Sequence, residues 1–147
     1  MKHYLQLLIV FIFLGGLNIS LNIQASEIPT GKMLMADAEK VTKKITTEEL
    51  KNMIENEPEL VLVDIRTRGE INKQGGAIDA PQNVSISRGW LEFDIQSHAT
   101  STDTPIVVYC GGGLRSPLAA KTLQDMGYTQ VRDYSAGYFG WKKFHAK

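Results

Sequence analysis

From about residue 45 onward, short apolar runs alternate with amphipathic stretches. The run 106–109 holds only β-branched and aromatic residues, which is typical of a strand buried on both faces of a parallel sheet. The run 60–66 has the same character until it ends in charges, and 84–87 and 131–134 predict two further strands. Helical spacing between these runs predicts an α/β fold, a single domain in which helices cover both faces of a parallel sheet.

Capping residues mark the first helix of this domain. Thr46 and Glu49 have the spacing of a capping box, and Ile45 with Leu50 fits a hydrophobic staple. We predict that this helix runs to about residue 56 and ends before Pro58, because a residue that precedes proline disfavours helical dihedrals.

Two further helical segments contain aromatic residues. Residues 89–95 must return the chain to the next parallel strand, which favours a short helix over a strand. Trp90 and Phe93 are expected in the core, since large aromatic side chains contribute most when buried. Near the C-terminus, Trp141 and Phe144 are expected to seal a short last helix against the sheet.

The central stretch is a strand, a loop and a capped helix. Ser116 and Pro117 predict a helix start, with serine capping the free N–H groups and proline at the first helical position. Gly127 predicts the end of that helix. Between the strand 106–109 and this helix lies the segment 110–115, which begins with the single cysteine of the chain.

The position of Cys110 predicts a reactive thiol. The C-terminal ends of parallel strands are where open α/β sheets bind ligands, and the next helix directs its N–H groups and positive dipole end at the loop. Gly111, Gly112 and Gly113 can turn backbone N–H groups inward, and Arg115 adds a permanent charge. Such surroundings lower a cysteine pKa from about 8.5 by roughly one to several units. The alternative is a glycine-rich turn with an inert buried cysteine.

The stretch 110–116 resembles the active-site loop of the rhodanese-like sulfurtransferases: cysteine, four residues, arginine and often serine. Related cysteine-dependent phosphatases place the arginine one residue further on, so the resemblance implies a loop sized for a sulfur-centred group. It covers about residues 45–144 and implies that Cys110 and Arg115 are catalytic. The substrate-binding residues that it implies are Gly111, Gly112, Gly113, Leu114 and Ser116.

Three other motifs accompany the loop. Asp64, Arg66 and Glu70 are similar to the family's Asp-Val-Arg-x-x-x-Glu signature, and we expect them to be structural supports of the site, because interior charges are tolerated when paired. Residues 75–84 match the family's Gly-His-Ile-x-Gly-Ala-x-Asn-Ile segment in part and lack its histidine. Residues 135–141 are similar to its closing Gly-Gly-x-x-x-Trp pattern.

The resemblance implies a sulfurtransferase that needs no cofactor and no metal. A sulfane sulfur would pass from a small sulfur-containing anion, thiosulfate or a persulfide, to Cys110, and then to cyanide or a thiol, which a partner protein can carry. Two alternatives stay open: a non-catalytic persulfide or thiol-partner binding module, and an arsenate reductase of the related loop type. His98 lies in a polar loop and is expected at the surface rather than as a base.

The N-terminus has the pattern of a signal peptide. Lys2 precedes an apolar core at 5–14, and Ala25 fits the last residue before cleavage. An uncleaved membrane anchor is the alternative, but the apolar stretch is short of the roughly 20 residues that span a bilayer. We therefore expect a signal peptide at 1–25, an N-terminal extension or linker at 26–44, the rhodanese-like domain at 45–147, and a periplasmic or secreted protein that contacts membrane only if the leader stays.

Charge and cysteine content exclude several classes. The chain has 16 basic and 16 acidic residues, and loss of the leader removes only Lys2, so the mature net charge is −1. No basic patch suggests a nucleic-acid partner. A lone cysteine cannot form an internal disulfide, and the absence of a Cys/His cluster argues against structural zinc. The length fits one domain, which we expect to be a monomer.

Overall fold

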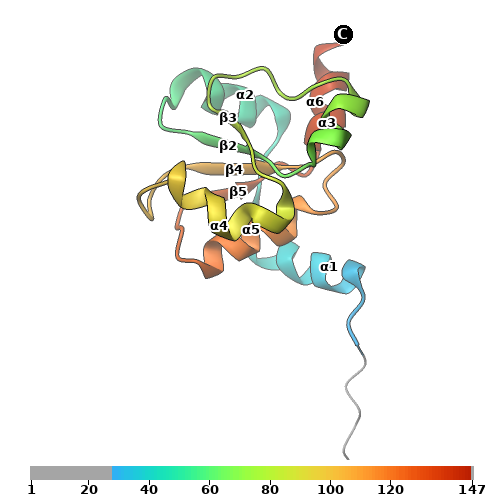
Figure 1. Ribbon diagram of the computed structural model, residues 1–147, viewed down its shortest axis with the longest axis vertical. Coiled ribbons are helices and arrows are strands. Elements are labelled where there is room, and N and C mark those ends of the chain that lie inside the picture. Colours follow the sequence, from blue (N-terminus) through green and yellow to red (C-terminus); the bar gives the residue numbers. More distant parts are fainter. Residues whose placement is uncertain (1–27, 147) are drawn as a thin grey trace, which may run out of the picture.

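The computed structural model describes residues 28–146, which form one five-stranded sheet with the order β1-β5-β4-β2-β3 (Figure 1). Every neighbouring pair of strands is parallel, as the apolar runs predicted. The strands are β1 (Lys43–Lys44), β2 (Val61–Asp64), β3 (Asn83–Ser85), β4 (Ile106–Tyr109) and β5 (Val131–Asp133).

Helices cover both faces of the sheet, so the predicted fold class is confirmed. Helices α1, α4 and α5 lie on one face, below the strands in Figure 1, and α2 and α6 lie on the other. The α-helices are α1 (Gly31–Val41), α2 (Thr47–Asn56), α3 (Arg68–Gln74), α4 (Leu91–Asp94), α5 (Ser116–Asp125) and α6 (Gly137–His145). Two 3₁₀ turns, η1 (Arg88–Trp90) and η2 (Ile95–Ser97), flank α4.

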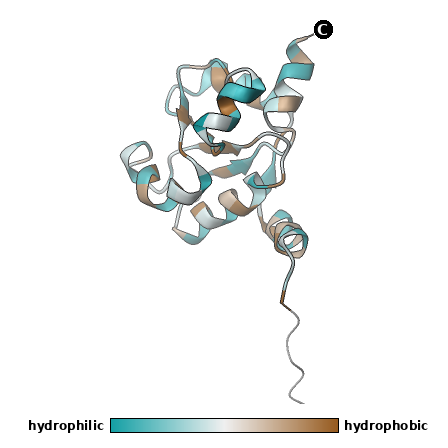
Figure 2. Cartoon of the chain, turned by 45° about the vertical axis from the view of Figure 1, so that its right-hand side comes forward, coloured by the Kyte–Doolittle hydropathy of each residue, from teal (hydrophilic) through white to brown (hydrophobic). Residues whose placement is uncertain are grey.

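The central strands supply side chains to both halves of the core. Val63 and Val108 face the cluster under α4 and α5, whereas Leu62 and Val107 face the cluster under α2 and α6. All eight residues of β2 and β4 are buried, which explains why their sequences are apolar except for Asp64 at the end of β2. Figure 2 shows the helices patterned with apolar and hydrophilic residues, as expected where one face meets the sheet.

The predicted caps are confirmed for α2. Thr46 and Glu49 form the capping box, and the helix ends at Asn56. A second capping box begins α3, a helix that the sequence pattern did not reveal, with Thr67 and Glu70 as its members. This cap orients the Glu70 side chain at the start of a helix that stands beside the cysteine loop.

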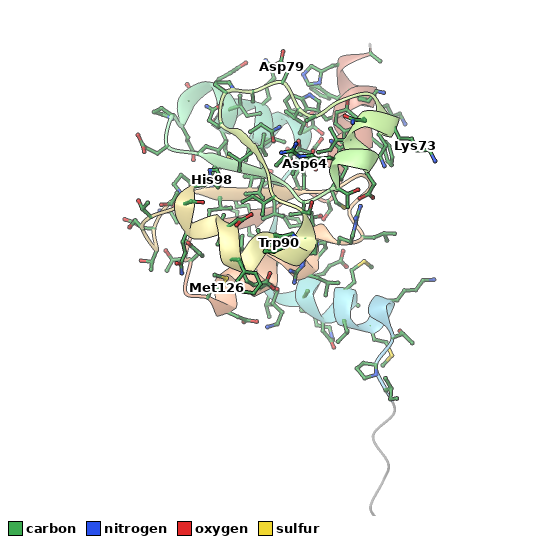
Figure 3. The ribbon with its side chains drawn as sticks, in the orientation of Figure 1. Asp64, Lys73, Asp79, Trp90, His98 and Met126 are labelled. Carbon is green, nitrogen blue, oxygen red and sulfur yellow. The ribbon has the colours of Figure 1, made fainter. Side chains whose placement is uncertain are left out.

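The prediction that Trp90 and Phe93 lie in the core is wrong. The segment is helical as expected, but Leu91 and Ile95, one turn apart, occupy its buried face. Trp90, labelled in Figure 3, is left 63% exposed and Phe93 77% exposed. The two rings meet edge to face, with their centroids 6.0 Å apart. Near the C-terminus, Trp141 packs on the core while Phe144 stays exposed.

The segment expected as an extension or linker contributes ordered elements from Gly31 onward. Helix α1 packs along α5, with Ala38 fully buried, and β1 pairs with β5 at the sheet edge. The expected leader at 1–25 lies outside the described residues. Across 28–146, no helix is long and apolar enough to span a membrane.

Candidate active site

Cys110 lies directly after β4, at the carboxyl end of the central strand. Its side chain is almost fully buried, with 2% of the residue exposed. The chain then bends through residues 111–115 and enters α5 at Ser116, so the thiol faces the N-terminal end of that helix. This is the strand, loop and helix that the sequence predicted.

The three glycines of the loop differ in what requires them: Gly113 is required by its dihedral angle and by close packing, Gly111 is favoured by close packing, and Gly112 has room for a Cβ. Only Gly113 has a positive φ, of 79°, and a Cβ there would lie 2.1 Å from the carbonyl oxygen of Ser135. A Cβ on Gly111 would lie 3.2 Å from the Phe139 ring, and one on Gly112 would lie 3.5 Å from it. Of the three glycines, which can all adopt positive φ, only Gly113 does so.

The carbonyl groups of the loop point away from its interior. Tyr138 donates its backbone N–H to the Cys110 oxygen at 2.8 Å, and Phe139 donates to Gly111 at 3.0 Å. Within residues 28–146, none of the backbone N–H groups from 111 to 116 donates a hydrogen bond to a protein acceptor. The first turn of α6 thus fixes the loop with its carbonyl groups outward, and its N–H groups stay available to an anion beside Cys110.

Arg115 is held by a carboxylate from a different element. Its two terminal nitrogens donate to the two oxygens of Glu70, at 3.1 and 2.6 Å. This pairing, helped by the backbone N–H of Thr67, lowers the pKa of Glu70 to about 2. Hydrogen bonding to Glu70 in turn raises the pKa of Arg115, and the neighbouring Cys110 sulfur acts in the same direction. The guanidinium is therefore a permanent cation next to the thiol.

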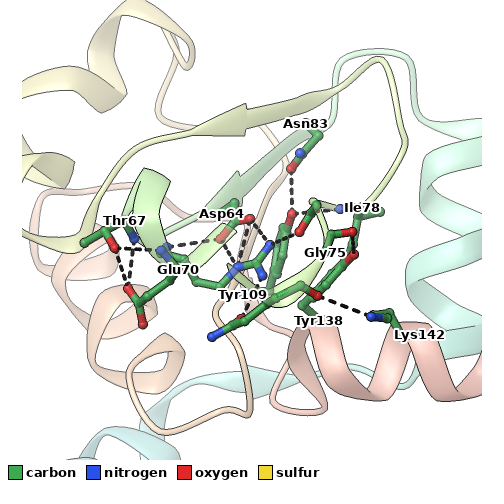
Figure 4. Close-up of polar contacts among 12 residues, drawn as sticks. Asp64, Thr67, Glu70, Gly75, Ile78, Asn83, Tyr109, Tyr138 and Lys142 are labelled. Carbon is green, nitrogen blue, oxygen red and sulfur yellow. Dashed lines mark hydrogen bonds and ion pairs between the residues drawn. The ribbon is translucent and has the colours of Figure 1, made fainter. Parts of the chain in front are cut away.

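Asp64 and Arg66 form a second pair that is fully buried. The Arg66 Nε donates to both Asp64 oxygens, at 2.9 and 3.1 Å, and its remaining nitrogens reach Gln74 Oε1 and the Gly76 oxygen (Figure 4). The guanidinium also lies 4.2 Å from the Tyr138 ring centroid. Burial lowers the pKa of Arg66, but the Asp64 contacts outweigh it and the net shift is upward.

The three expected supports thus divide into two groups. Gln74, which accepts from Arg66, lies 3.4 Å from the position of a Cβ on Gly111, so the Asp64–Arg66 pair braces the start of the loop. Glu70 instead binds Arg115 at the end of the loop. Their shared motif gave no indication of this division.

Contrary to the prediction, the Ser116 side chain does not cap α5. It is the first residue of the helix, Arg115 occupies the capping position without a side-chain hydrogen bond, and Pro117 follows at the second helical position. The Ser116 hydroxyl is fully buried and has no partner that meets hydrogen-bond geometry among the described residues. Gly127 has φ 101° just beyond the helix, so the predicted end is confirmed.

The rim of the loop is apolar. Leu114 is 68% exposed and Phe139 is 52% exposed. A groove of about 260 Å³ adjoins the rim; its lining residues are Gly31, Lys32, Met35, Leu114 and Leu118. His98 is exposed at the end of η2, as expected, and residues 28–146 contain no cluster of three His, Cys, Asp or Glu that could hold a metal.

Several residues at the site were not identified from the sequence. Gln74 lies outside the motifs, and Tyr138 and Phe139 occupy unspecified positions of the closing motif at 135–141, so only the fold shows that they reach the loop. Asp133 was read as part of a last strand, yet it is a fully buried carboxyl below Ser116. The available signal was an acidic residue at the carboxyl end of a predicted strand.

Comparison with known proteins follows the same part of the chain. The family model described as a rhodanese-like domain matches residues 46–144. The uncharacterized protein YqhL of Bacillus subtilis is 30% identical over 80 residues, which are 54% of this chain and 59% of YqhL. The chain thus spans less than two thirds of that relative's length. A sulfurtransferase of Allochromatium vinosum is 28% identical over 106 residues, 70% of this chain and 91% of that protein.

A solved structure shares both sequence and fold. The Rhodopseudomonas palustris protein RPA3614, described as a protein of unknown function and possible tyrosine phosphatase, is 32% identical with a TM-score of 0.71. The match covers 82% of this chain and 94% of that protein.

Proposed function

Because the chain belongs to the rhodanese-like domain family, we propose that it is a sulfurtransferase that carries a sulfane sulfur on Cys110. The observation that carries the proposal is a buried thiol faced by free backbone N–H groups and by a fixed arginine. Relatives named as sulfurtransferases support the general activity. The donor, the acceptor and the residue roles below are part of the proposal.

In the first step the Cys110 thiolate attacks the outer sulfur of thiosulfate. The new bond joins Cys110 Sγ to that sulfur, the S–S bond of thiosulfate breaks, and its electron pair leaves with sulfite. The products are a Cys110 persulfide anion and sulfite, so the total charge is unchanged. Covalent catalysis of this kind divides one transfer into two easier ones.

In the second step a nucleophile takes the outer sulfur from the persulfide. Cyanide would give thiocyanate and a thiol would give its own persulfide, and each reaction returns Cys110 as the thiolate. The N–H groups of residues 111–116 would stabilise the anionic persulfide between the steps, as preorganised donors do in oxyanion holes. The proposed acceptor in the cell is a thiol, on a small molecule or on a partner protein.

Arg115 would bind the oxygens of the donor and stabilise negative charge at the sulfur. Glu70 holds the guanidinium by both terminal nitrogens, which limits its rotation. The same pairing neutralises part of its charge, so we expect weak affinity for thiosulfate and a larger effect of Arg115 on the transfer step than on binding.

The test is the intact mass of the protein after incubation with thiosulfate, beside a Cys110→Ser control. We expect wild type alone to gain the mass of one sulfur and to lose it when cyanide is added. If the mass does not increase but Cys110 is alkylated rapidly at neutral pH, the substrate would be another sulfur donor or an oxyanion such as arsenate. No gain and a slow thiol would overturn it.

A second part of this test measures phosphatase activity, because related cysteine-dependent phosphatases use a similar loop. The structural neighbour described as a possible tyrosine phosphatase makes an aryl phosphate the natural counter-substrate. We expect no hydrolysis, because four residues separate Cys110 from Arg115, one fewer than in cysteine-dependent phosphatases. Hydrolysis faster than sulfur loading would replace the proposed activity.

We also propose that the protein is exported by the leader at 1–25. Expression of the full chain in a bacterial host should give a periplasmic product that begins at Ser26, which N-terminal sequencing checks. A product that keeps Met1 and sediments with membranes would support the uncleaved anchor instead.

A further inference from the structure

Asp133 is a buried carboxyl that the proposed reaction does not use. It ends β5, has no exposed surface, and lies in register with Lys44 of β1 and next to Val108 of β4. Carboxylates are rarely buried in this way unless they are paired, so its surroundings need an explanation.

Two hydroxyl groups face this carboxyl. Ser135 donates a short hydrogen bond to Asp133 Oδ2. Ser116 lies close enough to lower the pKa of Asp133, although burial has the larger effect and raises it. Neither the Ser116 Oγ nor the Asp133 Oδ1 has a partner that satisfies hydrogen-bond geometry within residues 28–146. Each of these two neighbouring residues therefore keeps a buried polar atom without a completed hydrogen bond.

Asp133, Ser116 and Ser135 form a cluster that packs against the cysteine loop. Ser116 follows Arg115 directly and opens α5, while the Ser135 carbonyl packs against Gly113 so closely that a Cβ would not fit. A change in the hydrogen bonds of Asp133 therefore acts on both the end and the middle of the loop.

We propose that Asp133 is a positioning residue for the Cys110 loop, and that its carboxyl sets the direction in which the buried Ser116 hydroxyl donates. When the carboxyl is ionised, Ser116 donates to Asp133 Oδ1 and is withdrawn from the loop. When the carboxyl is protonated, it donates to Ser116 Oγ, and the Ser116 O–H is free to donate toward the anion in the loop. The inference rests on the proposed role of Cys110 as the nucleophile.

The charged groups around Asp133 come from several elements. Lys44 of β1 stabilises the ionised form, and Glu39 of α1, which is paired with Lys44 at 2.6 Å, opposes it. From α5 and from the segment after β5, the groups that shift the pKa of Asp133 are the hydroxyls of Ser116 and Ser135. Lys44 and Glu39 act in opposite directions, and burial and the two hydroxyls each have a larger effect on the pKa of Asp133 than either of them.

The experiment measures the rate of Cys110 alkylation by iodoacetamide between pH 5 and 9, in the full chain. The variants are Asp133→Asn, Ser116→Ala and the double variant. Asp103→Asn is a matched control, because Asp103 also accepts from a serine two residues away and lies exposed in a surface turn. Circular dichroism and thermal melting establish that each variant folds.

The asparagine mimics the protonated carboxyl, with its amide donating to Ser116 and its oxygen accepting from Ser135. We expect alkylation of Cys110 at pH 6 to be at least about threefold faster in Asp133→Asn than in wild type, because the freed Ser116 O–H stabilises the thiolate. The control variant should match wild type. In the Ser116→Ala background the effect of Asp133→Asn should shrink clearly, which is the signature of coupled residues.

Three outcomes would overturn the proposal. An equal effect of Asp133→Asn with and without Ser116 would mean that the carboxyl acts by charge alone. Rapid alkylation that does not respond to Asp133 would refute the positioning role while leaving the proposed function standing. A slow thiol in every protein would refute both. If Asp133→Asn does not fold, the wild-type profile decides, since it should show two ionisations where Ser116→Ala shows one.

Discussion

Two arginine–carboxylate pairs flank the same cysteine loop, and they differ in burial and in the partners that bind each guanidinium. Arg66 and Asp64 are fully buried, and the guanidinium is also bound by Gln74 and the Gly76 carbonyl. Arg115 and Glu70 keep 39% and 32% of their side-chain surface exposed, and Arg115 lies near enough to the Cys110 sulfur for the two groups to interact electrostatically. The buried pair is a brace, whose partners are all inside the protein, whereas the exposed pair can exchange a partner with an incoming anion.

The largest effect is expected from breaking the buried pair. Asp64→Asn leaves Arg66 with an uncompensated charge in the interior, and removal of one partner of a buried pair costs about 3–5 kcal/mol. Urea unfolding should show this loss in the free energy of unfolding. Glu70→Gln is the matched control and should cost far less; equal losses would contradict the contrast between the two pairs.

The second largest effect is expected on the rate of sulfur loading rather than on the free energy of unfolding. Arg115→Ala removes the cation next to Cys110 from a partly exposed site, so the free energy of unfolding should fall by no more than about 1 kcal/mol. The rate of sulfur loading from thiosulfate should fall about 100-fold or more, by analogy with the loss of one oxyanion-hole donor.

Stopped-flow kinetics with thiosulfate and a urea melt on the same preparation separate these two quantities. Full activity in Arg115→Ala would remove the arginine from the proposed mechanism. A large loss in the free energy of unfolding of Arg115→Ala would instead show that Arg115 stabilises the fold, as Arg66 does.

The smallest effect is the pH dependence of the exposed pair. The pKa of Glu70 is about 2 in the folded protein and about 4.5 when unfolded, so the folded state holds the ionised form more tightly. Its contribution to stability is complete above pH 4.5 and is lost as the pH falls toward 2. After allowance for solvent screening we expect about 1 kcal/mol.

The measurement is urea unfolding at pH 6 and pH 3 for wild type and Glu70→Gln. The difference between the two proteins should narrow at the lower pH and also in high salt, because the pair is partly exposed. A difference that is constant across this range would show that the pair contributes no net stability.

The sequence predicted the parts of this molecule that depend on local patterns. The buried strand before Cys110, the capping box at Thr46 and the end of α5 at Gly127 follow from neighbouring residues and are confirmed. The family resemblance at 110–116 gave the loop its place between β4 and α5. Helical periodicity was too short at 88–97 to decide which face is buried, so Trp90 and Phe93 were placed wrongly.

Long-range relationships could not be obtained in this way. The separation of Glu70 from Asp64 and Arg66 depends on α3, whose capping box brings Glu70 to Arg115, 45 residues away. The hydrogen bond to the Cys110 carbonyl comes from Tyr138, on a helix that the sequence predicted only as a short last helix against the sheet. Such contacts are determined by the packing of elements rather than by the residues on either side.

The clamp made by α6 has a consequence for folding. The same first turn bonds the Cys110 and Gly111 carbonyls and lays the Tyr138 ring over Arg66. Local detachment of α6 would therefore release the loop and uncover the buried cation in a single event. Catalytic competence and the docking of this helix form one cooperative unit, whose opening native-state hydrogen exchange would detect as common protection of residues 138 and 139.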